Sequence, residues 1–600
     1  MEVFSALLTA LSLRSRPMSW YTPKLIVCLR EGYSVRRLRQ DVFAGLTVAV
    51  IALPLAMAFG IASLPENAIR ELSAVHPMLT PPAVGLFTAI IAGFLISALG
   101  GSRVQIGGPT GAFVVIVYDV AARHGYAGLA TATAMAGMLL VLFGICRFGA
   151  MIQFIPYPVT TGFTSGIAVL IASSQIKDFF GLDLVVDGLP AALPSDFLGK
   201  VQVLSAHAHT VAFWPSLVGM ACLVLMLALR AYSPRIPFAL IAVTLGALCV
   251  WLFELPVETI GSRFGGIPSS LPQPHLPAFS FELAREVFPD ALTIALLGAI
   301  ESLLSAVIAD GMEGYRHKSD CELVGQGLAN IASACCWGIP ATGAIARTVA
   351  NVKAGGHTPI AGIVHAVSLL AIMLVAAPLA AAVPLASLAA VLFIVAWNMS
   401  EIDHFRSLLR APRSDVLVLL STFLLTVFTD LTLAVGTGVV LASLLFIKRM
   451  AEVSSFAQIS GMEGLAQDRQ ALEEEETATP DHTNMGDIQV FELNGPFFFG
   501  SADRLKSTLL RVARPPQVFI LRMRHVPAMD ATGLFALEEL LGKCERSATQ
   551  LLLCELQEQP RSALERAGML DRLGAEHVIG SFEECLIAAQ RLSSNGGSDL

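Results

Sequence analysis

Charged residues are scarce in this chain. Only 14% of its 600 residues are Asp, Glu, Lys or Arg, 54% are hydrophobic, and the mean hydropathy is +0.68. Soluble proteins carry about 25% charged residues at roughly 45–50% apolar residues, so a string of soluble domains is excluded. The formal net charge is −8 rather than strongly positive, so no nucleic-acid partner is expected. The composition predicts a membrane protein with a soluble remainder.

The chain also lacks the motifs of metal sites and of common enzymes. Its ten cysteines contain no C-x-x-C, and only Cys335 and Cys336 are adjacent, so neither a zinc site nor a disulfide framework is predicted. The C-terminal part has no Walker motif, dinucleotide fingerprint or nucleophile elbow. The apolar run from Val3 to Leu13 lacks the flanks of a signal peptide and favours an interfacial helix. We expect no metal and no organic cofactor.

What is present is a long series of apolar runs, each close to the ~20 residues that cross a bilayer. They begin after the basic cluster Arg36, Arg37 and Arg39. Uninterrupted spans are predicted at 42–64, 83–99, 127–147, 156–176, 213–230, 236–253, 289–311, 322–338, 358–377 and 381–398. The pieces 415–429 and 432–447 predict a closing hairpin, and two segments broken by Gly and Pro, 104–123 and 339–353, bring the count to fourteen.

The distribution of Lys and Arg supports this count. With the N-terminus inside, the cytoplasmic connections hold Arg103, Arg147, Arg230, Arg235, Arg316, Lys318, Lys353, Arg406, Arg410, Arg413, Lys448 and Arg449. The opposite loops hold Asp183, Asp187, Asp196, Glu254 and Glu258. This positive-inside pattern predicts a multi-pass protein of the cytoplasmic (inner) membrane with both termini cytoplasmic.

The two broken segments resemble each other. The first runs Gly-Gly-Pro-Thr-Gly-Ala-Phe from Gly107, and the second runs Gly-Ile-Pro-Ala-Thr-Gly-Ala-Ile from Gly338. Seven spans in each half give the halves opposite orientations, and interrupted segments at matching places of inverted halves point to the binding site of a transporter. The alternative is a pair of ordinary Gly/Pro kinks.

Backbone chemistry suggests what these segments do. Pro109 and Pro340 lack an N–H, so each segment is expected to enter as an extended strand and to become helical near mid-membrane. Irregular backbone at that depth must be buried in protein or line a cavity. Each half-helix then directs free N–H groups and a positive dipole end to the same place, which suits an anion.

Two ionisable residues within spans are candidate working residues, because such groups cost roughly 2.5–3.5 kcal/mol to insert. Arg347 follows the second break by one turn, and its guanidinium suits carboxylate, sulfate or bicarbonate alike. A proton taken up by Glu301 as the anion binds would compensate charge, as in proton symport. The alternative is a static ion pair between Glu301 and Arg347. Asp310, near a span end, favours a structural role.

After the last span, an acidic stretch that includes Glu473 to Glu476 predicts a solvated linker. Strands are predicted at 488–493, 517–523 and 550–555, and helices at 502–513, 532–545 and 559–567, which together give a small α/β domain. Asp530 and Thr532 lie where a helix follows a strand and are suited to capping it. A regulatory loop that is phosphorylated or docks a cytoplasmic protein partner is the functional alternative.

Together these motifs resemble the sulfate permease (SulP) family of anion transporters, whose chains end in a STAS domain (sulfate transporter and anti-sigma factor antagonist). The resemblance covers residues 36–592. It is carried by Asp41 to Val48 with Pro54, Gly107 to Phe113, Glu301 to Leu303, Glu322 to Asn330, Arg347 to Asn351 and Asp530 to Gly533. Within the family the chain looks most like the bacterial four-carbon dicarboxylate branch, through Pro54 to Ala58, Gly108 to Thr110, Gln175 to Phe179, Asp310 to Met312 and Val395 to Glu401.

The resemblance implies an α-helical polytopic membrane protein with fourteen transmembrane segments in a 7+7 inverted repeat, a core domain that moves against a gate domain, and a small cytoplasmic α/β STAS domain. It also implies a homodimer. The expected divisions are an N-terminal segment 1–40, repeat one 41–254, an extracytoplasmic loop 255–288, repeat two 289–450, an acidic linker 451–486, the STAS domain 487–592 and a tail 593–600.

The resemblance places the substrate between the first, third, eighth and tenth spans. Carried over by position, the substrate-binding residues are Leu55, Phe59, Thr110, Gly111, Ala112, Ala344, Ile345, Ala346 and Arg347, with Glu301 as the proton-coupling residue. Three features depart from the family pattern: Leu55 stands where sulfate-type members usually carry Gln, Ala346 where a Ser is frequent, and Pro65 to Thr80 is an insertion of unexplained role.

We therefore expect a secondary active anion transporter, with proton-coupled uptake of succinate, fumarate or aspartate by an elevator-like mechanism. Sulfate, or bicarbonate with sodium as the coupling ion, is the alternative substrate. A membrane sensor with the STAS domain as its output is the alternative of another class. A membrane enzyme is disfavoured, because the sequence has no metal cluster and no nucleophile–base set.

Overall fold

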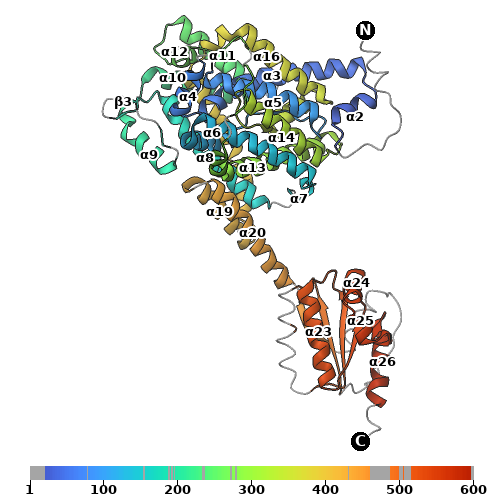
Figure 1. The fold of residues 1–600 in the computed structure, drawn as a ribbon. Coiled ribbons are helices and arrows are strands. Elements are labelled where there is room, and N and C mark those ends of the chain that lie inside the picture. Colours follow the sequence, from blue (N-terminus) through green and yellow to red (C-terminus); the bar gives the residue numbers. More distant parts are fainter. Residues whose placement is uncertain are drawn as a thin grey trace. The chain divides into compact units, whose positions relative to one another are not determined.

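A computed structural model describes residues 21–76, 79–152, 156–186, 189–190, 193–194, 196–232, 237–270, 273–277, 280–429, 431–453, 455–459, 487–498, 505 and 515–595. The chain divides into two compact units, Met1–Val440 and Leu441–Leu600, and each is described by itself (Figure 1). The N-terminal run from Val3 to Leu13, most of the acidic linker and nearly all of the predicted helix 502–513 lie outside the described residues.

The first unit is helical. Its first half contains α2 (Lys24–Arg30), α3 (Val35–Ser63), α4 (Glu66–Val75), α5 (Pro81–Leu99), α6 (Gly111–Ile145), α7 (Gly149–Ile152), α8 (Tyr157–Phe180), α9 (Phe197–Ala206), α10 (Phe213–Tyr232) and α11 (Phe238–Leu252). Its second half contains α12 (Ile260–Phe264), α13 (Phe281–Glu313), α14 (Ser319–Cys335), α15 (Ile345–Lys353), α16 (Pro359–Ala381), α17 (Leu385–Met399), α18 (Ile402–Leu408), α19 (Arg413–Phe428) and α20 (Leu431–Val453), the last of which continues into the second unit.

The fourteen predicted segments correspond to these helices. Eight helices of the described chain are long and apolar enough to cross a membrane. One of them, α6, contains a non-helical residue, Gly125, and therefore supplies two consecutive segments. With α3, α5, α8, α10 and α11 these make seven segments in the first half, and α13 to α17, α19 and α20 make seven in the second.

The first span begins earlier than expected. Helix α3 starts at Val35, so the basic cluster Arg36, Arg37 and Arg39 lies on the helix and not ahead of it. The Ser34 hydroxyl caps this start by accepting the backbone N–H of Arg37 at 3.3 Å. Hydropathy marks where a helix enters the apolar layer, whereas the helix itself extends beyond that layer into the polar zone.

The helices of the first unit pack in two groups. Helices α3, α5, α6, α13, α14, α15 and α16 pack mainly against one another and are here called the core group, whereas α8, α10, α11, α17 and α19 form the gate group. Small residues allow close approach within the core group. A Cβ on Gly137 of α6 would meet the carbonyl of Gly327 of α14, and a Cβ on Gly327 would meet the carbonyl of Gly137. Contacts of α3 with α11 and α17, and of α6 with α8, join the groups.

The insertion between the first two spans forms α4, which covers the break in α6. The Asn67 side chain donates to the carbonyl of Ala121 at 3.1 Å, before the break. Glu71, one turn along, accepts the N–H groups of Tyr126 and Ala127 at 2.6 and 3.0 Å, after the break. One face of α4 thus satisfies the backbone on both sides of Gly125, which explains a segment whose role the sequence left open.

The second unit is an α/β domain, as predicted. Its sheet has the order β5 (Ser455–Ile459), β6 (Ile488–Asn494), β7 (Val518–His525), β8 (Gln550–Cys554) and β9 (Val578–Ile579), with β5 antiparallel and the other neighbours parallel. Alternate strand residues pack on opposite faces, and Figure 1 shows α23 (Ala531–Arg546) and α26 (Phe582–Asn595) on either side of the sheet. Two further helices are α24 (Glu558–Arg566) and α25 (Met569–Leu573).

Strands β5 and β9 and helices α25 and α26 were not predicted. Five residues of mixed polarity directly after a membrane helix carry too weak an alternation to indicate a strand, and β5 exists only because it pairs with β6.

Candidate functional site

The two broken segments meet inside the first unit. Strands β1 (Gly107–Gly108) and β4 (Thr342–Gly343) pair antiparallel, with Gly107 opposite Gly343 and Gly108 opposite Thr342. Helix α6 begins at Gly111, three residues after β1, and α15 begins at Ile345, two residues after β4. The expected sequence of extended entry followed by helix is therefore present in both halves, and the two helix N-termini lie at opposite ends of one short strand pair.

Side chains from neighbouring elements satisfy the irregular backbone of these segments. The Thr348 hydroxyl accepts the N–H of Ile106 at 3.0 Å, and Asn351 donates to the carbonyl of Val104 at 2.8 Å. Asn330 of α14 both donates to the carbonyl and accepts the N–H of Ala341, each at 2.8 Å. The strand pair is therefore held in a fixed place, which is the condition under which non-helical backbone is tolerated at membrane depth.

The N-termini of α6 and α15 carry no side-chain caps. Thr110 precedes α6 and Ala344 precedes α15, and neither side chain accepts a backbone N–H of the helix that follows it. The Thr110 hydroxyl instead donates to Glu301 Oε2 at 3.1 Å. Two helix N-termini with unused N–H groups on either side of one strand pair make a suitable place for an anion.

Arg347 is buried next to this place. Its side chain is only 3% exposed, and Nη2 donates to the carbonyl of Pro109. Its Nη1 is buried and has no hydrogen-bond partner among the described residues. Arg347 thus ties the first turn of α15 to the end of β1, and it leaves a positive charge close behind both helix N-termini.

Gly108 provides the space for this guanidinium. Its φ of +148° lies in a region that L side chains rarely adopt, and a Cβ there would overlap Arg347 Nη1. A glycine is therefore needed at position 108 for two reasons: the positive φ, and the space that the Arg347 guanidinium occupies.

Glu301 comes from α13 and lies half-buried beside the start of α6. It forms no ion pair with Arg347 in the part of the chain that the structure describes. Glu301 accepts a hydrogen bond from Thr110, whereas Arg347 donates one to the carbonyl of Pro109. The alternative of a static Glu301–Arg347 pair is thus not the arrangement present. Asp310, further along α13, accepts the His317 backbone N–H at 2.8 Å and has the structural role expected of it.

The other expected pocket residues lie on α3, on α6, and on or directly before α15. Phe59 and Ala112 belong to one buried apolar cluster, and Leu55 packs against it. A Cβ on Gly111 would meet Met399 of α17, so the first turn of α6 touches the gate group. Ala344 is buried, Ile345 is half-buried and Ala346 is exposed. Direct hydrogen bonds join Thr110 with Glu301 and Arg347 with Pro109.

Sequence reasoning missed the polar framework around the strand pair. Ser302 Oγ and Thr342 Oγ1 lie 2.7 Å apart, and Gln105 donates to the carbonyl of Ser302 at 3.1 Å. It also missed His365 of α16, which is fully buried with neither ring nitrogen hydrogen-bonded within the described chain. A histidine in the middle of an apolar span was the available signal for this last residue.

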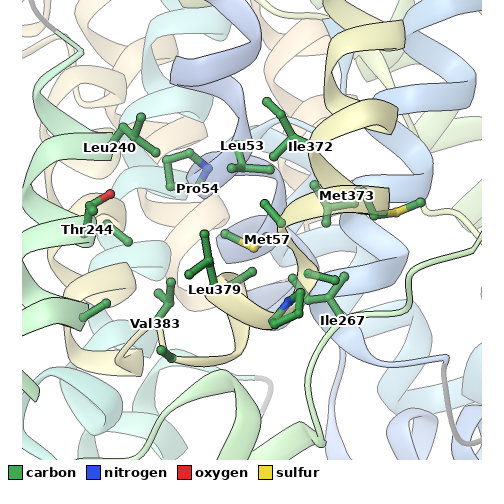
Figure 2. Close-up of a pocket in the computed structure, with 18 of the residues that line it drawn as sticks. Leu53, Pro54, Met57, Leu240, Thr244, Ile267, Ile372, Met373, Leu379 and Val383 are labelled. Atoms are coloured by element: carbon green, nitrogen blue, oxygen red, sulfur yellow. The ribbon is translucent and has the colours of Figure 1, made fainter. Parts of the chain in front are cut away.

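Two cavities of the first unit lie away from these residues. One of about 700 Å³ is lined by apolar residues of α3, α5, α11 and α16 (Figure 2). The other, of about 460 Å³, contains Glu66, Asp178, Glu258 and Arg263, and Arg263 Nη1 pairs with Asp178 Oδ1 at 2.9 Å. Neither includes Thr110, Glu301 or Arg347.

In the second unit, Asp530 caps α23 by accepting the backbone N–H of Gly533 at 2.8 Å. Thr532 is exposed on the first turn and does not share this capping role. Among the residues described, no group of three or more His, Cys, Asp or Glu side chains is placed to hold a metal ion.

Known proteins share both units. Residues 38–422 match the model of the sulfate permease family, and residues 479–584 match that of the STAS domain. YvdB of Bacillus subtilis, named as a candidate sulfate transporter, is 39% identical over 92% of this chain and 98% of its own. The bicarbonate transporter BicA of a Picosynechococcus strain is 30% identical over 92% of this chain and 94% of its own.

A solved structure of an anion transporter has the same fold as this chain. The murine Solute Carrier 26 family member A9 anion transporter, solved in an inward-facing state, superimposes with a TM-score of 0.79 over 98% of each chain at 17% identity. The membrane fold and the transporter class expected from the sequence are thus confirmed, and the relatives named above are transporters and not enzymes. The dicarboxylate branch is not among these relatives. The chain belongs to the sulfate permease family of anion transporters, with a C-terminal STAS domain.

Proposed function

We propose that this chain is a secondary active anion transporter that binds its substrate at the facing N-termini of α6 and α15. The observation that carries the proposal is the uncapped pair of helix N-termini across β1 and β4, with the buried charge of Arg347 behind them. The anion accepts backbone N–H groups, and the guanidinium contributes long-range attraction in a medium of low dielectric constant. Leu55 and Phe59 form the apolar wall.

The preferred substrate is a small inorganic oxyanion, sulfate or bicarbonate. Relatives that match nearly the whole chain are named for these two anions. The described site offers one fixed cation, Arg347, which matches a single anionic centre. The four-carbon dicarboxylates succinate, fumarate and aspartate are the second candidate, because Leu55 replaces the Gln usual in sulfate-type members.

Coupling is assigned to Glu301. Its bond to Thr110 holds the carboxyl group at the start of α6, where a bound anion and an ionised carboxylate would repel each other. Uptake of a proton by Glu301 together with the anion removes that repulsion, which gives proton symport. Sodium at the same carboxylate is the alternative coupling ion.

Movement of the core group against the gate group completes an elevator-like cycle. The first turn of α6 lies directly against α17 at Gly111, so the bound anion sits at the boundary between the groups. We further propose residence in the cytoplasmic membrane with both termini cytoplasmic, a homodimer, and regulation through a protein partner at the Asp530–Thr532 loop.

The test is uptake by purified full-length protein in proteoliposomes. Labelled sulfate, bicarbonate and succinate are offered separately and in competition, at two external pH values. Saturable uptake of sulfate or bicarbonate, with weak competition by succinate, supports the oxyanion assignment. Preferential succinate uptake reverses the order of substrates. Absence of uptake of all three anions would contradict transport and favour a sensor with a STAS output.

A further inference from the structure

The apolar cavity of about 700 Å³ has no place in the anion site. Among the described residues that line it, Thr244 is the one polar side chain and none is charged. Figure 2 shows Leu240 and Thr244 of α11 on one side, and Leu53 and Pro54 of α3 with Ile372 of α16 on the other. Cavities lined in this way stay dry and accept apolar guests, so the occupant is neither water nor an anion.

The cavity is lined by predicted membrane spans, and part of its lining is exposed on the surface of the first unit. Its walls belong to the predicted spans α3, α11 and α16, and three of its large apolar side chains are well exposed: Leu248, Trp251 and Leu379. Trp251 is 70% exposed and is the penultimate residue of α11. Tryptophan at a span end is typical of the membrane–water interface, so the cavity runs from the headgroup level into the hydrocarbon.

The same cavity crosses the boundary between the two helix groups. Helices α3, α5 and α16 belong to the core group and α11 to the gate group, and all four contribute lining residues. Pro54 and Met57 line the cavity on the same helix that carries Leu55 and Phe59 to the proposed anion site. A shift of one group against the other must therefore change the shape of the cavity.

We propose that this cavity binds one acyl chain of a bilayer phospholipid, with the headgroup beside Trp251, and that the bound chain sets the balance between core–gate positions. A volume of about 700 Å³ is within the ~300–1,000 Å³ of sites that enclose molecules of this size. A guest that fits one arrangement of the walls better than another shifts their equilibrium by that difference. The effect of the lipid on the core–gate balance rests on the proposed elevator movement, whereas the binding of the lipid does not.

Binding is tested without transport. Full-length protein in nanodiscs of phosphatidylethanolamine and phosphatidylglycerol receives a trace of phospholipid with a diazirine on one acyl chain, and labelled peptides are mapped after irradiation. Labelling concentrated on α11 and α16 peptides at cavity residues is expected. Uniform labelling of all lipid-facing helices, or crosslinking of these residues to a second copy of the chain, would overturn the proposal.

Matched variants separate the cavity from the surface around it. Ala376→Trp fills the cavity from α16, whereas Val375→Trp adds the same ring at a neighbouring, 82% exposed position outside it. We expect Ala376→Trp to reduce cavity labelling at least fivefold and Val375→Trp to leave it within twofold. Ala247→Phe on α11, with Leu245→Phe as its control, repeats the comparison if Ala376→Trp fails to fold. Equal labelling in filled and control variants contradicts the site.

The proposed effect of the bound lipid on transport is tested separately. Ala376→Trp is expected to change the maximal rate of anion uptake at least twofold at unchanged KM, because it alters movement and not the anion site. An unchanged rate despite lost labelling would overturn regulation while leaving lipid binding intact. If the wild-type protein takes up no anion, the proposed transport function is contradicted. The labelling result, which does not depend on transport, still tests lipid binding.

Discussion

Gly108, Arg347 and Glu301 show how single residues would build the proposed anion site. The positive φ and missing Cβ of Gly108 leave room for the Arg347 guanidinium, which in turn fixes the end of β1. Glu301 reaches the same place from α13 through Thr110. Each of these contacts can be broken by a single substitution, and a folded variant then reports on the site.

Gly108→Ala is expected to reduce anion uptake at least tenfold. The added methyl group displaces Arg347 Nη1, and the residue is strained at its φ, which costs about 1–3 kcal/mol. Uptake in proteoliposomes is the measurement. Gly311→Ala on α13 is the control, since a Cβ there has no atom within 4 Å. Wild-type uptake in Gly108→Ala would show that the position of Arg347 is unimportant.

Glu301→Gln is expected to abolish the stimulation of uptake by an inward proton gradient while exchange of anions continues. The amide keeps the size and the contact with Thr110, but it cannot take up a proton at physiological pH. Uptake is measured with and without a gradient. The exposed Glu282 of the same helix supplies the control Glu282→Gln. Gradient dependence retained in Glu301→Gln removes this residue from coupling.

Lys200 of α9 gives a pH-dependent prediction. Its side chain is buried, over the Tyr118 ring, and burial lowers its pKa from 10.5 to about 8. Because the unfolded state binds this proton more tightly, stability is reduced below pH 8 and recovers as pH rises from about 8 to 10.5. Lys200→Met should raise unfolding free energy by up to about 3 kcal/mol at pH 7.

The gain in Lys200→Met should shrink toward zero by about pH 10.5, as followed by thermal unfolding in detergent at several pH values. A gain independent of pH would mean that better packing, and not removal of a buried ammonium, is the cause.

At the scale of elements, α4 and the break in α6 form one structural unit. Glu71 accepts two backbone N–H groups of the second part of α6, and Asn67 holds the end of the first part. The first part of α6 begins at the proposed anion site, so this joint fixes the position of a helix that we propose to contact the substrate.

Glu71→Ala is expected to lower the unfolding free energy by about 1–2 kcal/mol, because a lost helix cap costs ~0.5–2 kcal/mol and two N–H groups are affected. Thermal unfolding in detergent is the measurement. Glu66→Ala on the same helix is the control: Glu66 pairs at 3.7 Å with Arg70, whose side chain is exposed, and such a pair is worth ~0–1 kcal/mol. Equal losses in the two variants would contradict the capping role.

The sequence predicted elements better than it predicted contacts. The spans were found because length and hydropathy depend on local composition, and β1 and β4 because Pro109 and Pro340 forbid a continuous helix. The role of α4 could not be predicted, since its partners lie about 55 residues away in the chain. The burial of Arg347 could not be predicted either, because the direction of its guanidinium depends on Gly108 and Pro109 from the other half.

At the scale of the whole molecule, each half contributes one broken segment to a single strand pair, which is the centre of the proposed anion site. Neither half contains the site alone, because β1 pairs only with β4 and the arginine of one half bonds the carbonyl of the other. The site is part of the core group, whose boundary with the gate group passes Gly111.

The central claim is that the anion binds at the N-termini of α6 and α15 with Arg347 behind them. The most direct measurement is the affinity of purified protein for sulfate and bicarbonate, compared among wild type, Arg347→Ala and Arg347→Lys. We predict at least a tenfold loss in Arg347→Ala and a smaller loss in Arg347→Lys, which keeps the charge but not the planar fork. Wild-type affinity in a folded Arg347→Ala protein would contradict the account.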